Sequence, residues 1–141
     1  MKNIILLILL SFTSNKIIAQ NTKIDSIFYG NYGGKRVYTN SYFFTEKSIV
    51  KHKKYTDITK GIEKTSNSNS IENWNDLLRN IDITYFRKIK SGKSRTDSCG
   101  SDTYITLKLK NGETINIINA YNDKVWSEIQ KKLENLKNKI E

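Results

Sequence analysis

The segment TYITLKLKNGETINIINA (residues 103–120) predicts the two strands around which the fold is built. Apolar residues alternate in both halves, and an Asn-Gly pair at 111–112 separates them, as in a β-hairpin. A two-residue turn would place Leu107 opposite Asn116, so that the two apolar rows faced opposite sides of the sheet. A three-residue turn that ends in a left-handed glycine avoids this conflict. We therefore predict a turn of Lys110, Asn111 and Gly112, with the cross-strand pairs Leu107–Ile115 and Ile105–Ile117.

Three more strands are predicted before this hairpin. The segments KIDSIFYG (23–30) and KRVYTNSYFFT (35–45) are rich in β-branched and aromatic residues, and NYGG between them supplies a glycine pair for a turn with positive φ. The segment SIVKHKKY (48–55) predicts a third strand, and its central lysines suggest an exposed edge of the sheet. Residues 57–70 are polar and lack periodicity, so we interpret them as a mobile loop.

Two amphipathic helices complete the pattern. The first is predicted to start after Ser70, whose side chain can cap the first turn. The second is predicted to start after Asn122 or Asp123. Between the first helix and the central hairpin, residues 82–89 are expected to leave the helix and to reach the core through Tyr85, Phe86 and Ile89. The apolar stripes consist of Ile71, Trp74, Leu77, Leu78 and Ile81 in the first helix and of Trp126, Ile129, Leu133, Leu136 and Ile140 in the second.

The resulting order, β-β-β-α-β-β-α, favours an α+β fold. A helix that is apolar on one stripe only can cover one face of an antiparallel sheet. We therefore expect two layers, with a single antiparallel sheet of about five strands and both helices packed on one face. The length of residues 20–141 suits one small domain.

The first 19 residues, MKNIILLILLSFTSNKIIA, have the order of a secretory signal peptide. Lys2 precedes an apolar run from Ile4 to Leu10, and the small residue Ala19 stands before Gln20. This run is much shorter than the roughly 20 apolar residues that span a bilayer. We expect cleavage near Ala19/Gln20 and a mature chain without a transmembrane span, located in the periplasm or outside the cell. Lys16, close to the cleavage point, leaves an uncleaved tether as the alternative.

The chain is strongly basic. Its formal charge of +10 falls by two when Lys2 and Lys16 leave with the signal peptide. A basic surface can bind nucleic acid, anionic lipid or another polyanion. Twenty lysines, twenty isoleucines and sixteen asparagines against only four arginines instead indicate a compositional bias of the coding DNA, so nucleic acid is not the expected partner. The residues that would bind a polyanion under this alternative are Lys47, Lys51, Lys53, Lys54, Arg87, Lys88, Lys90 and Lys93.

Cys99 is the only cysteine and His52 the only histidine. A cysteine hydrolase would need the two side chains together, and nothing in their spacing brings this about. A lone cysteine cannot close a disulfide within its own chain, so a Cys99-linked dimer is the alternative to a monomer. We expect a monomer in which Cys99 is a small buried side chain, and no catalytic residue. Asp97 and Asp102 lack the alternation of a calcium loop and are expected to accept hydrogen bonds from nearby amides, so no metal or cofactor is predicted.

The first hairpin is unusually aromatic. Strand alternation places Tyr38, Tyr42 and Phe44 on one face, and Val37 and Phe43 on the other. A two-layer fold buries one face only, and exposed aromatic rows often mark partner sites. Half-buried tyrosines without a partner are the alternative interpretation. The predicted partner-binding residues are Tyr32, Tyr38, Tyr42 and Phe44, with the neighbouring loops 30–34 and 91–101.

The order of these motifs resembles the emfourin-type family of small bacterial protease-inhibitor domains. The motifs are the YGG of residues 32–34, the WNDLL helix (74–78), DITYF (82–86) and the hairpin SDTYITLKLKNGE (101–113), followed by the C-terminal helix. The resemblance covers most of residues 24–138 and implies binding to a thermolysin-like metalloprotease. No inhibitory residue can be carried over from it. The leading hypothesis is therefore an exported, non-enzymatic domain that binds a protein partner, with protease inhibition as one version.

Overall fold

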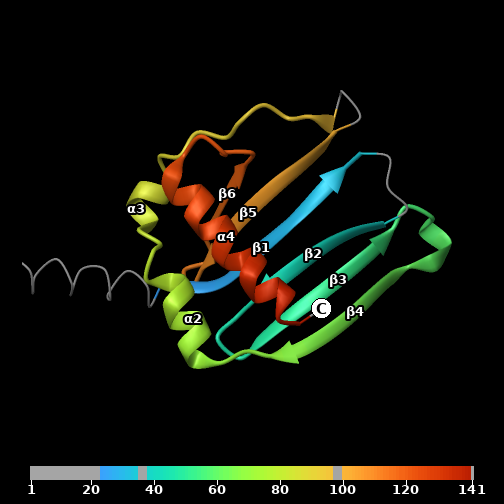
Figure 1. Ribbon diagram of the computed structural model, residues 1–141, viewed down its shortest axis with the longest axis horizontal. Helices are drawn as coiled ribbons and strands as arrows, with labels where there is room; N and C mark the ends of the chain where they lie inside the picture. The colour runs from blue at the N-terminus through green and yellow to red at the C-terminus, as the bar shows by residue number, and fades with distance from the viewer. Residues whose placement is uncertain (1–22, 35–37, 97–99, 141) are drawn as a thin grey trace, which may run out of the picture.

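Six antiparallel strands form one open sheet in the computed structural model, which describes residues 23–34, 38–96 and 100–140 (Figure 1). The strand order across the sheet is β4-β3-β2-β1-β5-β6, so β1 and β5 lie in its interior. The strands are β1 (Ile24–Gly33), β2 (Tyr38–Phe44), β3 (Ser48–Tyr55), β4 (Ile62–Ser68), β5 (Ser101–Leu109) and β6 (Thr114–Ile118). The helices are α2 (Ile71–Leu78), α3 (Ile83–Phe86) and α4 (Lys124–Asn138), with a 3-10 turn, η1 (Ile58–Lys60).

The predicted turn of the β5–β6 hairpin is confirmed. Ile105 pairs with Ile117 and Leu107 with Ile115. The Leu109 amide donates to the Glu113 carbonyl at 2.8 Å, which leaves three residues in the turn. Gly112 has φ +88°, the left-handed conformation that the three-residue turn requires. The apolar rows of both strands therefore face the same side of the sheet.

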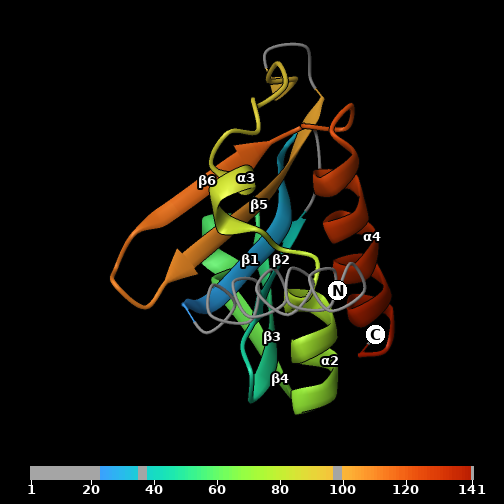
Figure 2. The same ribbon diagram turned by 90° about the vertical axis from the view of Figure 1, so that its left-hand side faces the viewer.

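Helices α2 and α4 lie on one side of the sheet, as Figures 1 and 2 show together. Both predicted caps are confirmed: Ser70 accepts a hydrogen bond from the Asn73 amide, and Asp123 accepts one from the Trp126 amide. The apolar stripes of the two helices meet the inward rows of the strands. The fully buried core residues include Ile27, Phe44, Leu77, Ile105, Leu107, Trp126, Ile129 and Leu133. An α+β fold with one antiparallel sheet is thus confirmed, and Ile71, half exposed, is the member of the α2 stripe that the core leaves out.

Residues 82–89 contain a third helix that was not predicted. Asp82 caps α3 by accepting hydrogen bonds from the amides of Thr84 and Tyr85. Phe86 and Ile89 are buried as expected, but Tyr85 is 45% exposed, so its predicted place in the core is wrong. A single helical turn explains this, because residues 85 and 86 cannot both face the core from adjacent helix positions.

The interpretation of residues 57–70 as a mobile loop is also wrong. This segment contains η1 and the whole of β4, which pairs with β3 from Lys54↔Ile62 to Ser48↔Ser68. The sheet therefore has six strands instead of five, and the edge is β4 and not β3. Backbone hydrogen bonds alone can hold an edge strand whose two faces are both exposed, so β4 needs no apolar periodicity. No alternation of apolar and polar residues therefore marks β4 as a strand in the sequence.

The first hairpin forms as predicted, but its turn begins later. β1 runs through Gly33, which pairs with Ser101 of β5, and Gly33 and Gly34 have φ of +83° and +75°. β2 pairs with β1 from Ile27↔Phe44 to Gly30↔Ser41. Because β1 bonds to both neighbours, its odd and even positions from Ile27 onward define the two faces of the whole sheet, and a bulge between Ile24 and Ser26 shifts this alternation.

Asp102 anchors the loop before β5. Its buried carboxylate accepts hydrogen bonds from Ser94 Oγ (2.6 Å), the Arg95 amide (2.7 Å) and Asn119 Nδ2 (2.6 Å). These bonds, the one from Ser94 first, lower the pKa of Asp102 to about 2. The predicted hydrogen-bonded turn is thus confirmed for Asp102, whereas Asp97 and Cys99 lie outside the described residues.

The described residues also include no helix that is long and apolar enough to cross a membrane. The expected signal peptide, residues 1–19, lies outside them.

Candidate binding cleft between the sheet and α4

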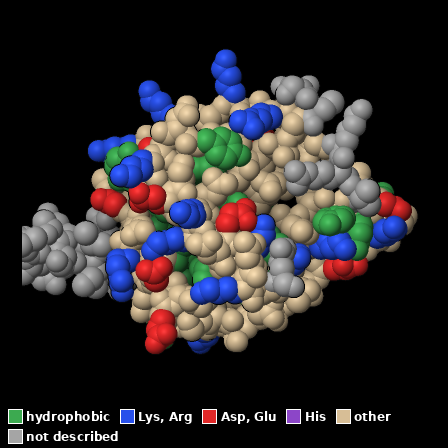
Figure 3. Space-filling model, viewed as in Figure 1, with side chains coloured by type: hydrophobic (Ala, Val, Ile, Leu, Met, Phe, Trp, Pro, Cys, Tyr) green, Lys and Arg blue, Asp and Glu red, His purple; other side chains and the backbone are tan. Residues whose placement is uncertain are grey.

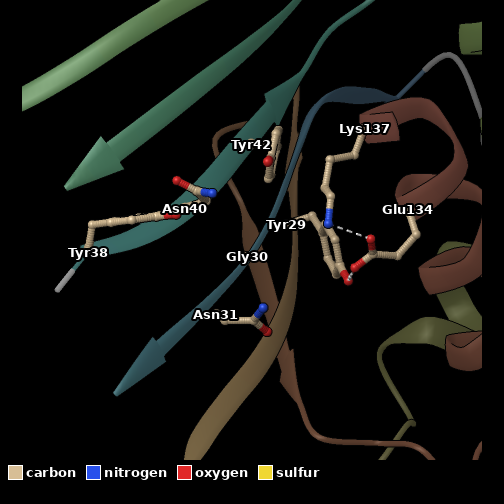
Figure 4. A pocket seen from close by; sticks show the side chains of 8 residues that line it. All are labelled: Tyr29, Gly30, Asn31, Tyr38, Asn40, Tyr42, Glu134 and Lys137. Atoms are coloured by element: carbon tan, nitrogen blue, oxygen red, sulfur yellow. Dashed lines mark hydrogen bonds and ion pairs between the residues drawn. The ribbon is translucent and has the colours of Figure 1, made fainter. Parts of the chain in front are cut away.

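A cleft of about 410 Å³ opens where the ends of β1 and β2 pass beneath the C-terminal half of α4 (Figure 4). Odd positions of β1 and even positions of β2 face α4, so both strands present polar and aromatic side chains to it. Figure 4 shows them on one side of the opening and two charged side chains of α4 on the other. The cleft is lined by Tyr29, Gly30, Asn31, Tyr38, Asn40, Tyr42, Glu134 and Lys137.

Glu134 and Lys137 form the α4 wall. They are one helical turn apart, and Lys137 Nζ donates to Glu134 Oε2 at 2.7 Å. The Tyr29 hydroxyl donates to the other carboxylate oxygen, Glu134 Oε1. Burial, followed by this hydrogen bond, raises the pKa of Tyr29 well above its usual value, so Tyr29 is a neutral donor. The wall is therefore preorganised, with its carboxylate already paired.

On the side of the cleft formed by β2 and β3, lysine ammonium groups lie close to tyrosine rings. Tyr42 is approached by Lys51 and Lys137, whose Nζ atoms lie 5.9 and 5.8 Å from the ring centroid. Lys53 Nζ lies 4.6 Å from the Tyr38 centroid and 4.8 Å from that of Tyr55. Cation–π contacts of this kind orient the ammonium groups, and Lys53 Nζ also forms an ion pair with Glu63 Oε2 of β4 at 3.6 Å. The hydrogen bond to Tyr55 raises the pKa of Lys53, which keeps its charge.

Asn40 leaves one hydrogen-bond acceptor unused. Its Oδ1 atom is buried and has no partner among the described residues. A buried acceptor without a donor costs about 1–3 kcal/mol. Because Asn40 lines the cleft, a rotation of its side chain that exposes this oxygen would offer it to an N–H group of a bound molecule.

Both carboxylate oxygens of the acidic residue in the cleft are already paired. Glu134 is engaged by both Tyr29 and Lys137, and no nucleophilic hydroxyl stands beside a free base in it. Within the residues that the structure describes, no group of three or more His, Cys, Asp or Glu side chains could hold a metal ion. His52 pairs with Ser41 in register, at a position that faces away from α4.

The predicted partner-binding residues divide between the cleft, the core and the far face. Tyr38 and Tyr42 line the cleft, with Tyr38 exposed and Tyr42 buried at its base. Phe44 is fully buried beneath the helices, so we remove it from the contact surface. Tyr32 faces the side away from α4, where its ring lies 5.9 Å from that of Tyr104.

The predicted polyanion-binding residues do not gather in one place. Lys51 and Lys53 stand at the rim of the cleft, and Lys54 alternates to the far face of the sheet. Arg87 follows α3 at the opposite end and makes a two-pronged ion pair with Glu113, at 2.9 and 2.6 Å. Lys88 and Lys90 are exposed near it, and Lys47 and Lys93 lie in other loops. On the face drawn in Figure 3, the Lys and Arg side chains are likewise dispersed among Asp and Glu.

Sequence reasoning missed most of the cleft. The apolar stripe expected for the last helix leaves out Glu134 and Lys137, and the sequence pattern gives Tyr29, Asn31 and Asn40 no role. A weak signal existed, because Glu134 and Lys137 directly flank the buried positions Leu133 and Leu136 at the border of the apolar stripe. Their meeting with β1 could not be read from spacing, since Tyr29 and Glu134 are 105 residues apart.

Comparison with known proteins assigns no family to the chain. No protein-family model matches it. No curated protein matches its sequence either. The resemblance to emfourin-type domains therefore remains a prediction, and function has to be argued from the cleft.

Proposed function

We propose that this protein is an exported, non-enzymatic domain that holds a segment of a partner protein in the cleft. The observation that carries the proposal is the buried, unpartnered Oδ1 of Asn40 in the cleft. The two charged side chains that line the cleft, Glu134 and Lys137, already hold each other in place. A peptide backbone can supply the N–H group that this acceptor lacks. Exposed tyrosine next to well-placed cations is also typical of protein interfaces.

The rim suggests the chemistry of that partner. Lys51 and Lys53 lie next to tyrosine rings, and on β3 both pair with the β2 residues Tyr42 and Asn40 that line the cleft. A segment that bears a carboxylate next to an aromatic or aliphatic side chain would meet an ammonium group and a ring together. An acidic partner also suits the net charge of the chain.

Site-specific photocrosslinking tests the cleft with a matched control. Tyr38 and Tyr85 are 43% and 45% exposed, but only Tyr38 lines the cleft. A benzoylphenylalanine at each position in turn, introduced in the native cells, should give a discrete protein adduct at Tyr38 and none at Tyr85. Equal labelling at both positions, or none at Tyr38, would contradict the proposal.

Protease inhibition is the most specific version of this function, and it rests on the emfourin-type resemblance. It predicts that the purified mature domain slows hydrolysis by thermolysin-like metalloproteases secreted by the same organism. A Lys53→Glu variant, with its rim charge reversed, should inhibit less well than Lys88→Glu, which changes the charge far from the cleft. If none of these metalloproteases is slowed, protease inhibition is ruled out. Binding of another partner protein in the cleft is then still tested by the crosslinking experiment.

Export is tested by sequencing the N-terminus of the protein recovered from cell fractions. The N-terminal sequence of the protein recovered from the periplasm or the medium should begin at Gln20. An intact Met1 terminus in the cytoplasmic fraction would contradict it.

The two alternative functions make different predictions. A polyanion-binding protein should bind heparin or DNA with an affinity that falls steeply with salt. The separation of Lys51 and Lys53 from Arg87, Lys88 and Lys90 argues against one continuous polyanion site. A cysteine hydrolase through Cys99 and His52 should lose activity in a Cys99→Ser variant, and the proposal expects no activity to lose.

A further inference from the structure

Strand β4 is an open edge of the sheet. The strand order ends at β4, and Figure 1 shows no helix along its outer side. The other edge, β6, is shorter and partly covered: the Ile118 carbonyl accepts from the Gly92 amide at 2.7 Å, and the Ile118 amide donates to Ser91 Oγ. The two edges are therefore not equivalent, and β4 is the one left open.

The hydrogen-bond pattern shows which residues of β4 face outward. The Asn69 amide donates to the Lys47 carbonyl, directly before the Ser48↔Ser68 pair. Bonded and non-bonded pairs alternate along an antiparallel ladder, so Glu63, Thr65 and Asn67 bond to β3. The remaining residues direct their N–H and C=O groups away from the sheet. Among the described residues nothing pairs with the outward groups of Ile62, Lys64, Ser66 and Ser68.

Apart from the charged residues Glu63 and Lys64 near its start, β4 lacks the usual protections of an edge strand. The chain has no proline, and the β3–β4 register runs without a bulge from Ile62 to Ser68. Natural edges are blocked by prolines, bulges or charges on the edge itself. The lysines of the LysHisLysLys run at 51–54 lie one strand inward, on β3. The outer part of β4 is instead Thr65, Ser66, Asn67 and Ser68, small side chains that leave its backbone accessible.

We propose that β4 receives an extended acidic segment of another protein as a seventh strand. The charge next to the edge selects the acidic character, because β3 and β4 together carry four lysines and one glutamate. On the side of α4, Lys53 Nζ already lies 3.6 Å from Glu63 Oε2 of β4, whereas Lys54 and Lys64 project on the other side. An incoming strand with carboxylates on the face away from α4 would meet Lys54 and Lys64, while its backbone bonds to the open edge. This surface is separate from the cleft, so the inference stands whether or not the cleft binds a partner.

Proline at Ser66 tests the inference directly. The Ser66 amide points outward, so Ser66→Pro removes a donor from the open edge without removing a β3–β4 hydrogen bond, whereas Ser66→Ala keeps it. Random twelve-residue peptides displayed on phage are selected on the mature domain, and the recovered peptides are then measured by titration. We expect acidic, β-forming peptides whose affinity falls about tenfold or more in Ser66→Pro and stays unchanged in Ser66→Ala. Recovered peptides that bind Ser66→Pro as well as the wild type, or the recovery of no peptides, would overturn the inference.

Charge variants provide a second test that does not depend on how well the proline variant folds. Ser66→Glu and Ser66→Lys both keep the backbone N–H. Ser66→Glu should weaken the selected peptides and Ser66→Lys should strengthen them, and equal affinities would contradict the acidic occupant. Sedimentation of the wild type and Ser66→Pro examines the other occupant, a second copy of the chain. A wild-type dimer that Ser66→Pro abolishes would show that the edge pairs with itself and overturn the proposal. Failure of both tests leaves the crosslink expected at Tyr38 unaffected.

Discussion

The Asp102 carboxylate holds the loop before β5 through hydrogen bonds from Ser94, Arg95 and Asn119. Its three hydrogen bonds stabilise the ionised form, so its folded pKa of about 2 lies below the ordinary value of 3.8. A group whose pKa is lowered on folding contributes stability above the unfolded pKa and loses it as the pH falls toward the folded one. The contribution of Asp102 is therefore complete near neutral pH and declines between about pH 4 and pH 2.

Replacing this carboxylate predicts a pH-dependent loss of stability. Asp102→Asn should be less stable than the wild type at pH 6, with a difference that shrinks as the pH approaches 2. Urea denaturation at pH 6, 4 and 3 measures the difference. Asp25→Asn, an exposed substitution in β1, is the control and should show no such trend. A constant difference for Asp102→Asn would mean that shape rather than charge holds the loop.

Gly30 leaves no room for a side chain between β1 and its neighbours β2 and β5. A Cβ atom there would lie 2.9 Å from Ser41 Cα in β2 and 2.9 Å from the Tyr104 hydroxyl in β5. Gly30→Ala should therefore lower the free energy of unfolding by about 1–3 kcal/mol, a typical cost of overpacking. Thermal or urea unfolding measures it, with Thr106→Ala on the same face as the control. An unchanged midpoint would mean that the three strands are farther apart than described.

At the scale of elements, α2, α4 and the β5–β6 turn were predictable and β4 was not. Caps such as Ser70 and Asp123 act within three residues, and the turn at Gly112 acts within one hairpin. Such local contacts leave a signature in the sequence. Apart from Ile62 and Thr65, β4 consists of residues with weak strand preference, and the strand depends on the backbone of β3.

Amide hydrogen exchange distinguishes β4 from a mobile loop residue by residue. The amides of Glu63, Thr65 and Asn67 point toward β3 and should exchange slowly, and those of Lys64 and Ser66 should exchange fast. NMR of the mature domain measures each site. Uniformly fast exchange from Ile62 to Ser68 would support the loop that the sequence suggested.

At the scale of the whole molecule, the sheet has one covered and one open face. Even positions of β1 and odd positions of β2 face away from the helices. Phe28 and Phe43 pair there with ring centroids 4.5 Å apart, and both are only partly buried. The core therefore lies entirely on the side of α2 and α4.

Adjacent residues of β1 test this asymmetry. Ile27 is fully buried under the helices, so Ile27→Ala should cost about 2–5 kcal/mol in the free energy of unfolding. Phe28→Ala, on the open face, should cost less although it removes more atoms. Urea denaturation of the two variants compares them. A larger loss for Phe28→Ala would mean that the open face is covered in the folded protein.

The sequence by itself determined the α+β class, both helix starts and the register of the central hairpin, because each depends on contacts between residues close in the chain. Only the tertiary structure decided that β4 is the open edge and that Tyr29, Asn40, Tyr42, Glu134 and Lys137 share a cleft. The physical reason is distance along the chain. Backbone pairing of an edge strand makes no demand on its side chains, and a cleft between β1, β2 and α4 joins residues about a hundred positions apart, as Tyr29 and Glu134 show.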